Sequence, residues 1–386
     1  MTDQDVICLA PTEWSGAWQR YQEIMVRLAN AGNSVLVIEN LYRISQPVPT
    51  AVPVVGRLVR KAWQVLRQVR LRPHLVGSRL RVLSPPIPPL GALAVLAWPI
   101  LRAGLGAAGS PRSSRPPVLW AAFPAPITRR LVEALQPRLV VYDCASAFRK
   151  DPAIDPLVVA AEDWLLTRAD LIFTDSRRLW EEHSRMRNCC YWVPTGVAYE
   201  QFASANPRVS GPAHPPVIGY VGTLHRWLDS QLVAEVAERH PEWRFVFVGP
   251  RRARADLGRL EHLPNIQLLG PRPHDTLPAL LAQFDVTWIP YQLAEFTEYV
   301  LPTKLLEYLA AGCPVVSTDL PEVRAYAPPV RIGKSARGIE DQIAAALHAP
   351  PDERGRELAK RYDWQIQMNQ IQHYLDAALS APSDLR

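Results

Sequence analysis

Short apolar runs recur along the chain, and most of them end in a loop. The first run, DVICLA, is followed by a loop over 11–16, a helical pattern over 17–31 and a second apolar run, SVLVIEN. Apolar runs of this length are typical of buried strands, and a strand–helix–strand order predicts parallel pairing. The pattern resumes with PVLWAAF, RLVVYD and LIFTDS. We therefore predict a parallel α/β sheet in the first half of the chain.

The second half repeats this plan. Its apolar runs are VIGYVG, FVFVGP, NIQLLG, DVTWIP and PVVST, with helical stretches between them, for example at 230–239 and 304–311. Between the halves, SANPRVSGPAHPP has the proline, glycine and small polar residues of a linker. The pattern predicts two doubly wound, Rossmann-like α/β domains that face a central cleft. The predicted segments are an N-terminal domain (1–203), a linker (204–216), a C-terminal domain (217–363) and a final helix and tail (364–386).

Length and composition agree with this organisation and limit the chemistry. The chain has 386 residues, which favours two domains, and its 48% hydrophobic content is that of a folded protein. The five cysteines form no CxxC pair and have no histidine cluster beside them, so a structural zinc site is not expected. Asp3 and Asp5 form a DxD that precedes the first strand and is interpreted as a solvated terminus. We expect no metal and no cofactor, and the acidic N-terminus and odd cysteine count favour the cytoplasm.

The charge distribution is uneven. The net charge is +6, but the stretch 40–132 holds 14 Lys and Arg residues and no Asp or Glu. Within a predicted insertion at about 43–132, GRLVRKAWQVLRQVRL (56–71) has the pattern of a basic amphipathic helix. LGALAVLAWPIL (90–101) is uncharged but too short for a bilayer, which needs about 20 residues. We predict contact with an anionic membrane surface, the alternative being that both segments simply cover the N-terminal sheet. Nucleic acid is not expected, because the basic face has few aromatic residues.

The segment EFTEYVLPTKLLEYLAAGCPVVST (295–318) carries the most specific chemical signal. It predicts a loop, a helix that begins near Pro302, a glycine stop and a buried strand. The free N–H groups at such a helix start favour a phosphate, and Lys304 adds positive charge in the same turn. Glu307, further along the helix, can accept two hydroxyl hydrogen bonds, as a ribose diol offers. The alternative is a surface helix with one Lys–Glu pair.

The sequence PTKLLEYLAAGCPVVST resembles the donor-binding signature of family-4-type retaining glycosyltransferases, which have the GT-B fold. VIGYVGTLHRWLD is similar to their phosphate-binding glycine turn, and EWSGAWQRYQEIMVRLANAGNSVLVIEN is similar to their acceptor-side opening. FVFVGP, NIQLLGPRPHDTLPALLAQFDVTWIPY and the final tryptophan-containing helix follow in the family's order, so the resemblance covers most of the chain. The subgroup that it resembles is the teichuronic-acid-type and related exopolysaccharide transferases.

This resemblance implies roles for individual residues. Glu307 would bind the donor ribose, and Lys304 would neutralise the phosphate. Backbone near the diphosphate would come from Gly222 and Thr223, and contacts at the helix start from Leu301, Pro302 and Thr303. Arg251 and His274 would flank the base. Gly16 and Asp143 would face the cleft from the acceptor side, with Asp143 and Glu298 as catalytic candidates; for Asp143 a strand-end cap is the alternative.

Two features differ from the family pattern. Eight residues separate Glu298 from Glu307, where the family has seven, and position 299 is Tyr299; Glu295 is a weaker substitute for the first glutamate. The usual Arg and Lys after the glycine turn are missing. His225 and Arg226 lie near that place, and Arg226 is the better phosphate ligand because its charge is permanent.

Taken together, the sequence predicts a metal-independent, retaining glycosyltransferase at the cytoplasmic face of the membrane. It would move a sugar from a nucleotide-sugar donor to a lipid-linked or polysaccharide acceptor. Two other hypotheses stay open: a nucleotide-sugar epimerase on the same scaffold, and an inactive scaffold that binds glycan or membrane. The sequence does not identify the base, the sugar, the acceptor or the oligomeric state.

Overall fold

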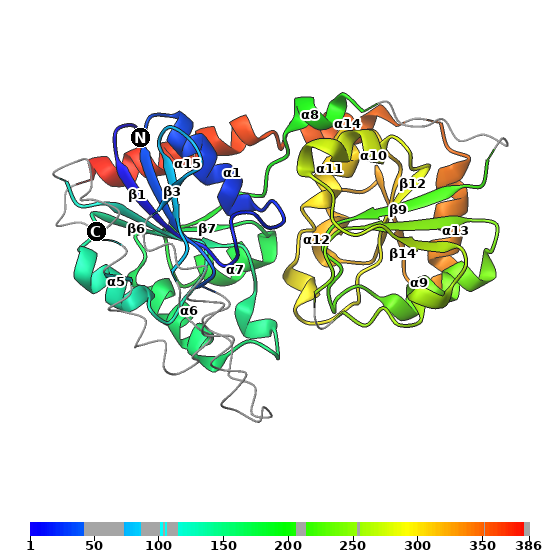
Figure 1. Cartoon of the computed structure of the whole chain (residues 1–386), viewed down its shortest axis with the longest axis horizontal. Coiled ribbons are helices and arrows are strands. Elements are labelled where there is room, and N and C mark those ends of the chain that lie inside the picture. Colours follow the sequence, from blue (N-terminus) through cyan, green and yellow to red (C-terminus); the bar gives the residue numbers. More distant parts are fainter. Residues whose placement is uncertain are drawn as a thin grey trace. The chain divides into compact units, whose positions relative to one another are not determined.

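A computed structural model describes residues 1–41, 73–85, 101–102, 105, 115–205, 214–252, 255–350 and 352–381. These residues divide into two compact units (Figure 1). The first unit takes residues from 1–175, 179–193 and 368 onward, and the second takes 176–178 and 194–367. Both are α/β units built on a largely parallel sheet, as the apolar runs predicted.

The first unit contains an eight-stranded sheet with the order β3-β4-β2-β1-β5-β6-β7-β8. All neighbouring strands pair in parallel except β3 and β4. The strands are β1 (Asp5–Leu9), β2 (Ser34–Ile38), β3 (His74–Leu75), β4 (Leu80–Leu83), β5 (Val118–Ala121), β6 (Leu139–Cys144), β7 (Leu171–Thr174) and β8 (Cys190–Trp192). The strand order reverses at β1, which lies between β2 and β5. In open parallel sheets, such a switch point is where ligands bind, beyond the carboxyl ends of the strands.

The second unit contains a six-stranded, fully parallel sheet with the order β11-β10-β9-β12-β13-β14. The strands are β9 (Val217–Val221), β10 (Arg244–Val248), β11 (Ile266–Leu268), β12 (Val286–Ile289), β13 (Val315–Thr318) and β14 (Val330–Gly333). In chain order this is the 3-2-1-4-5-6 arrangement of dinucleotide-binding folds. Its switch point lies between β9 and β12, so the loops after these two strands are the expected place for a ligand.

Helices cover both faces of the second sheet (Figure 1). One face carries α9 (Ser230–Arg239) and α13 (Ala336–Leu347), which pack against each other. The other carries α8 (Tyr199–Ala203), α10 (Leu277–Leu281), α11 (Lys304–Ala310) and α14 (Glu353–Lys360). A short helix, α12 (Pro321–Arg324), precedes β14. Fully buried aromatic residues fill the core, among them Trp288, Phe245 and Tyr308.

The helices of the first unit are α1 (Arg20–Asn30), α5 (Thr128–Leu135), α6 (Pro156–Arg168) and α7 (Arg177–Ser184), whose first two residues belong to the second unit. The last helix, α15 (Trp364–Ser380), begins in the second unit and joins the first from Met368 onward. There Tyr374 stacks on Tyr191 with ring centroids 3.9 Å apart. The final helix is therefore part of the first unit's core rather than a separate tail.

Three expectations about organisation need correction. The second unit begins at Pro194, before the predicted linker 204–216, most of which lies outside the described residues. The predicted insertion, about 43–132, includes β3, β4, β5 and part of α5, so part of it belongs to the first sheet. The strands β3, β4, β8 and β14 were not predicted. The basic segment 56–71 lies outside the described residues, as does 90–101 apart from Leu101.

Among the helices of the described residues, none combines the length and the apolar character needed to cross a bilayer.

Candidate functional site

Two glycine turns bring the ends of β9 and β10 into contact. Gly222 follows β9 with a φ of 149°, and Gly249 follows β10 with a φ of 145°, which side chains other than glycine rarely adopt. A Cβ atom at Gly249 would lie 2.0 Å from the carbonyl oxygen of Gly222. Both positions therefore require glycine. The turn at Gly222 is the one predicted to approach the diphosphate.

Lys304 lies directly against this turn, because a Cβ atom at Gly222 would be 2.3 Å from its Cε. It is the first residue of α11, its side chain is 8% exposed, and its ammonium donates to the hydroxyl of Tyr291 at 2.5 Å. The ammonium also lies 5.0 Å and 4.9 Å from the ring centroids of Tyr220 and Tyr291. Aromatic faces stabilise a cation within about 6 Å. The sequence motif and the strand order thus bring Gly222 and Lys304 together at the switch point.

Tyr291, which follows β12, joins Lys304 to the loop after β9. His225 Nε2 lies 3.2 Å from the Tyr291 hydroxyl, and the backbone N–H of Trp227 donates to His225 Nδ1 at 3.1 Å. Because a backbone N–H can only donate, Nε2 carries the imidazole proton and donates it to Tyr291. Burial and the nearby Lys304 ammonium lower the pKa of His225 to about 3, so the ring is neutral at physiological pH. His225 therefore orients Tyr291 and adds no charge.

The hydroxyls of two further tyrosines complete the base of the turn. Tyr220 lies 3.4 Å from the Tyr291 hydroxyl and donates to the carbonyl of Thr223 at 2.8 Å. The hydroxyl of Tyr308, on α11, donates to the Val221 carbonyl and accepts from the Val221 N–H. These contacts connect β9, β12 and α11 through buried hydrogen bonds. Lys304 is therefore held in a fixed position.

The helix α11 begins at Lys304, as the helical stretch 304–311 predicted, two residues after Pro302. Pro302 and Leu301 are buried before the helix, and the exposed Thr303 is its N-cap residue, already in the right-handed helical conformation. The carbonyl of Pro302 accepts from Leu305 N at 2.9 Å, so Pro302 supports the first turn from outside it. At the other end Gly312 has a φ of 74° and stops the helix, as predicted.

Glu307 and His274 meet one turn further along α11. Glu307 Oε1 lies 3.2 Å from His274 Nε2, and both side chains are partly exposed. His274 also packs edge-on against Phe202, with ring centroids 5.5 Å apart. The carboxylate and the imidazole can offer an acceptor and a donor to the same ligand. The structure thus pairs a residue that the sequence placed on a helix with one that it placed in a loop.

Glu298 has a different set of partners. It lies in a short 3₁₀ turn (Thr297–Tyr299), and its Oε2 accepts from Arg178 at 2.9 Å. Arg178 also lies 5.3 Å from the ring centroid of Tyr299. About 45% of the Glu298 side chain is exposed, and Glu295 is exposed as well. The structure therefore gives Glu298 an accessible carboxylate beside a cation.

The other arginines predicted near the donor have different surroundings. The guanidinium of Arg226 lies 4.6 Å from the ring centroid of Trp227, which stacks on Phe296 at 4.9 Å. These stacked rings place the loop between β9 and α9, which carries Arg226, beside the segment that contains Glu298. Arg251 is exposed and forms an ion pair with Glu261, which competes with any phosphate for its charge.

In the first unit, Asp143 is not an open catalytic carboxylate. It is 2% exposed at the end of β6, and its Oδ1 accepts from Arg20 Nε at 2.9 Å. A buried ion pair of this kind keeps its carboxylate from solvent and substrate, so the predicted catalytic role is corrected to a structural one. The predicted acceptor-side Gly16 is exposed, and its N–H closes a turn onto the Glu13 carbonyl at 3.0 Å.

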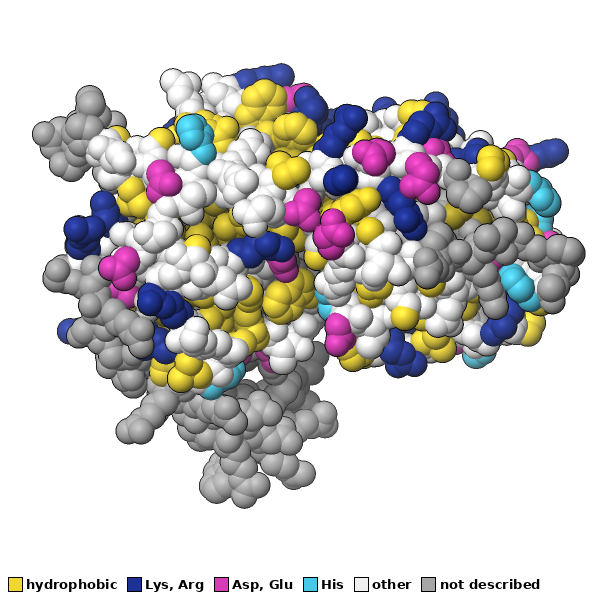
Figure 2. All heavy atoms as spheres, turned by 90° about the horizontal axis from the view of Figure 1, so that it is seen from above, with side chains coloured by type: hydrophobic (Ala, Val, Ile, Leu, Met, Phe, Trp, Pro, Cys, Tyr) yellow, Lys and Arg dark blue, Asp and Glu magenta, His cyan; other side chains and the backbone are white. Residues whose placement is uncertain are grey.

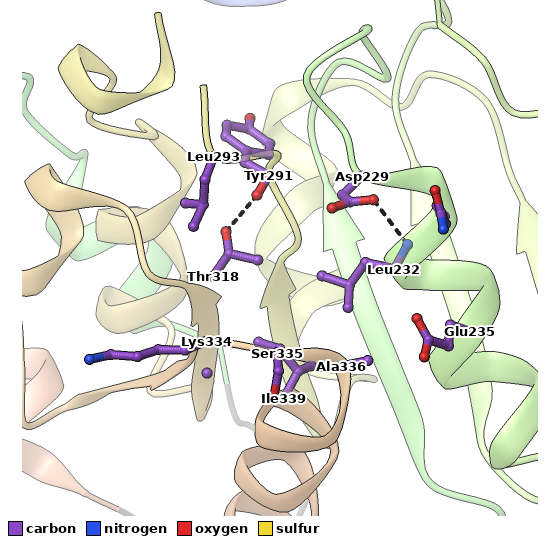
Figure 3. Close-up of a pocket in the computed structure, with 12 residues that line it drawn as sticks. Asp229, Leu232, Glu235, Tyr291, Leu293, Thr318, Lys334, Ser335, Ala336 and Ile339 are labelled. Atoms are coloured by element: carbon purple, nitrogen blue, oxygen red, sulfur yellow. Dashed lines mark hydrogen bonds between the residues drawn. The ribbon is translucent and has the colours of Figure 1, made fainter. Parts of the chain in front are cut away.

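A cavity of about 280 Å³ lies on the α9 and α13 side of the second sheet (Figure 3). Asp229 caps α9 by accepting from Leu232 N, and Ser335 caps α13 by accepting from Gly338 N. Thr318 donates to the Tyr291 carbonyl at 2.8 Å, and the apolar side chains of Leu293 and Ile339 line the same space. The cavity therefore lies behind the Tyr291 segment. No group of His, Cys, Asp or Glu among the described residues has the arrangement of a metal site.

The sequence analysis missed Tyr291, Tyr220 and Tyr308, and gave His225 only a weak phosphate role. A signal for Tyr291 was available, because it directly follows the strand-like run DVTWIP. Its importance depends on β12 lying beside β9, which only the strand order reveals.

Comparison with known proteins agrees with this geometry. Residues 215–348 match the family model described as "Glycosyl transferases group 1". Bacillus subtilis (strain 168) has a relative named as the teichuronic acid biosynthesis glycosyltransferase TuaH. It is 30% identical over 291 residues, which is 66% of this chain and 71% of the relative.

Solved structures of the same fold include sucrose-phosphate synthase from Thermosynechococcus elongatus, with a TM-score of 0.72, 14% identity, and coverage of 98% of this chain and 100% of that one. Anabaena HepE in complex with UDP and glucose gives a TM-score of 0.66 at 14% identity, covering 97% and 100% of the two chains. At this identity the likeness shows the fold, which is GT-B with two Rossmann-like domains. From the relative and the family model together, this chain is an enzyme that belongs to the group 1 glycosyltransferases.

Proposed function

We propose that this enzyme transfers a sugar from a nucleotide-sugar donor to a lipid-linked or polysaccharide acceptor, with retention of anomeric configuration and without a metal ion. The observation that carries the proposal is the buried Lys304 ammonium against the Gly222 turn, on the same helix as Glu307. A backbone turn, a fixed cation and a carboxylate are the groups that a diphosphate and a ribose diol require.

The proposed chemistry depends on stabilising the negative charge that develops on the leaving diphosphate. An acceptor hydroxyl oxygen bonds to the anomeric carbon as the bond from that carbon to the diphosphate oxygen breaks. The electron pair of the broken bond goes to the diphosphate, which becomes more negative and can take up the proton that the acceptor hydroxyl loses. Lys304 stabilises that charge with the two ammonium protons that remain after its bond to Tyr291. The lysine does not have to reorganise during the reaction, because Tyr291 and two aromatic faces already hold it.

The other donor-side roles follow from position. Glu307 accepts hydrogen bonds from the ribose hydroxyls. His274, which is hydrogen-bonded to the same carboxylate, borders the base. Gly222, Thr223, Leu301, Pro302 and Thr303 contribute backbone next to the diphosphate, and Arg226 adds charge from the neighbouring loop. Glu298 accepts hydrogen bonds from hydroxyls of the transferred sugar. The UDP and glucose bound by HepE and the UDP-glucose bound in a second structure of it support a nucleotide-sugar donor.

The acceptor and the location are proposed from the sequence and from the relative. TuaH is named for teichuronic acid biosynthesis, which supports a cell-envelope polysaccharide. The acid-free basic stretch 40–132 supports attachment to the inner face of the cell membrane. On the face drawn in Figure 2, basic and acidic side chains of the described residues are interspersed. The proposed attachment rests on the basic segment 56–71, which lies outside the described residues.

The proposal is tested by incubating the full chain with a panel of nucleotide sugars, each radiolabelled in the sugar, and a bacterial lipid extract, with and without EDTA. We expect label in the lipid or polysaccharide fraction and no loss on chelation. Donor that is isomerised without acceptor would indicate an epimerase. Donor that is neither bound nor consumed would contradict the proposal.

The membrane part has a test of its own. Replacement of Arg60, Lys61 and Arg67 by glutamine should reduce flotation with vesicles that contain anionic lipid. The matched control replaces Arg239, Arg259 and Arg354, which lie outside the stretch 40–132 and are exposed on described helices or next to a described 3₁₀ turn, and it should leave flotation unchanged. Equal flotation of both triple variants would refute attachment through the basic segment.

A further inference from the structure

The loop Pro11–Gln19 of the first unit carries two tryptophans at the place where that sheet favours a ligand. It connects β1 to α1, and β1 is the strand at which the order of the sheet reverses. Ligands of open parallel sheets bind beyond the carboxyl ends of strands at this point. Asp143, which was expected to act here, is buried in an ion pair with Arg20. The exposed side chains of the loop are therefore the better candidates for contacts with a ligand.

Trp14 is fixed at both its backbone groups. Its N–H donates to Glu39 Oε2 at 2.5 Å, and its carbonyl accepts from Gln22 Nε2 at 2.7 Å. Glu39 is buried at the end of β2 and also accepts from Ser84. The indole of Trp14 packs edge-on against Tyr21, with centroids 6.2 Å apart. The loop therefore presents Trp14 in a single orientation although it lies outside any helix or strand.

Trp18 is fixed in turn but stays accessible. Its ring packs edge-on against Trp14 at 6.0 Å, and its Nε1 donates to Glu23 Oε2 at 2.8 Å. Even so, 40% of the residue is exposed, which makes it one of the few large apolar side chains on the described surface. The three residues before it, Ser15, Gly16 and Ala17, are all small and exposed, so Trp14 is the side chain of the loop that packs against the indole.

We propose that Trp14 and Trp18 form a stacking platform for a pyranose ring of the acceptor glycan; this inference rests on the proposed function. A pyranose has a face of C–H groups, whose positive edges complement the negative face of an indole. A rigid aromatic side chain loses little entropy on binding, which suits a weakly apolar ligand such as a sugar.

A lipid surface fits this loop less well. Exposed tryptophans also occur at membrane interfaces, but usually beside basic residues. The charged residues from 11 to 27 are Glu13, Arg20, Glu23 and Arg27, of which Arg20 is paired with Asp143 and Arg27 with Glu23. These charges balance, so this segment has no excess of positive charge to attract anionic headgroups, which favours a neutral, hydroxylated ligand.

The test uses ¹⁹F NMR of the full chain labelled with 5-fluorotryptophan, with resonances assigned from Trp14→Phe, Trp18→Phe and Trp164→Phe. The probes are cellotriose, maltotriose, chitotriose and trigalacturonate, and, separately, vesicles containing 30% phosphatidylglycerol. We expect the Trp14 and Trp18 resonances to shift with at least one trisaccharide and the Trp164 resonance to stay in place. Shifts with vesicles alone, or with none of the probes, would overturn the proposal.

A kinetic arm separates this inference from the proposed function. Trp18→Ala should raise the KM for the glycan acceptor about tenfold, the effect expected for losing one aromatic contact, with the Kd of the donor unchanged. Trp18→Phe should restore most of the loss, because the stacking face is kept. An unchanged acceptor KM in Trp18→Ala would refute the platform even if transfer itself were established. Trisaccharide shifts without any transfer would leave the platform standing and refute the proposed reaction.

Discussion

The hydroxyl of Tyr291 is the single atom on which the geometry of the donor side depends most. It accepts from the Lys304 ammonium at 2.5 Å and from His225 Nε2 at 3.2 Å, and it lies 3.4 Å from the Tyr220 hydroxyl. Tyr291→Phe removes that oxygen and keeps the ring, so the packing and the cation–π contact with Lys304 are retained. The substitution therefore isolates the hydrogen bonds.

The size of the effect follows from the groups that lose a partner. A hydrogen bond to a charged group contributes about 1.5–3 kcal/mol, and a buried donor left without an acceptor costs about 1–3 kcal/mol. The ammonium can turn toward solvent or phosphate, whereas the half-buried His225 ring is held by the Trp227 N–H and its own N–H loses its acceptor. We therefore expect the free energy of unfolding to fall by about 2 kcal/mol. We also expect the donor Kd to rise by about tenfold, because Lys304 then has to be ordered on binding.

The assay combines chemical denaturation with titration calorimetry of the donor. Tyr142→Phe is the matched control, because Tyr142 is a buried tyrosine of the first unit that donates to Glu162 at 2.7 Å. It should lose comparable stability and keep the donor Kd. Donor affinity that is equal in Tyr291→Phe and the wild type would refute the view that Tyr291 positions Lys304.

Three further predictions follow. The pKa of His225 is lowered to about 3, so between about pH 6.5 and 3 only the unfolded chain binds a proton at this histidine. The free energy of unfolding should therefore fall with acid in this window, and His225→Asn should weaken that pH dependence in denaturation melts at stepped pH. Burial raises the pKa of Glu162 to about 7, so its stabilising contribution is full below about pH 4.5 and is lost as the pH rises through 7. At pH 8, Glu162→Gln should be more stable than the wild type by up to about 3 kcal/mol, and equal stability would count against a buried carboxylate. Gly222→Ala should destroy donor binding in calorimetry, since its Cβ would meet Lys304 and its φ is 149°, whereas Gly77→Ala, with open space around the Cβ, should bind normally.

The periodicity of the chain predicted much of the fold because most central strands are continuous apolar runs. Among the strands that were not predicted, β3 has only two residues, and β14 is an edge strand that is buried only at its first and last positions. The first boundary was misplaced because Pro194 begins the second unit within a segment that has no linker composition. A linker-like composition indicates a flexible segment, whereas the limits of a unit are set by the contacts that its residues make.

The candidate donor residues were recognised in the sequence where the signal is local. Lys304 and Glu307 lie three residues apart on one helix, and Gly222 ends an apolar run, so each could be recognised alone. The partners of other residues are distant: Arg20 is 123 positions from Asp143, and Tyr291 is 66 from His225. Side-chain pairing over such separations depends on strand order, so the sequence could not show that Asp143 is paired or that Tyr291 is central.

Binding of nucleoside diphosphates tests the central claim most directly. UDP, GDP, ADP and dTDP are titrated by calorimetry into the wild type, Lys304→Met and Glu307→Gln, with Lys334→Met, whose side chain is 81% exposed, as the control. We predict that at least one of the four binds the wild type and the control equally. Its affinity should fall by about ten- to a hundredfold in Lys304→Met, the range expected for one charged hydrogen bond, and measurably in Glu307→Gln. Equal affinities in all four proteins, or no binding of any diphosphate to the wild type, would contradict the donor site described here.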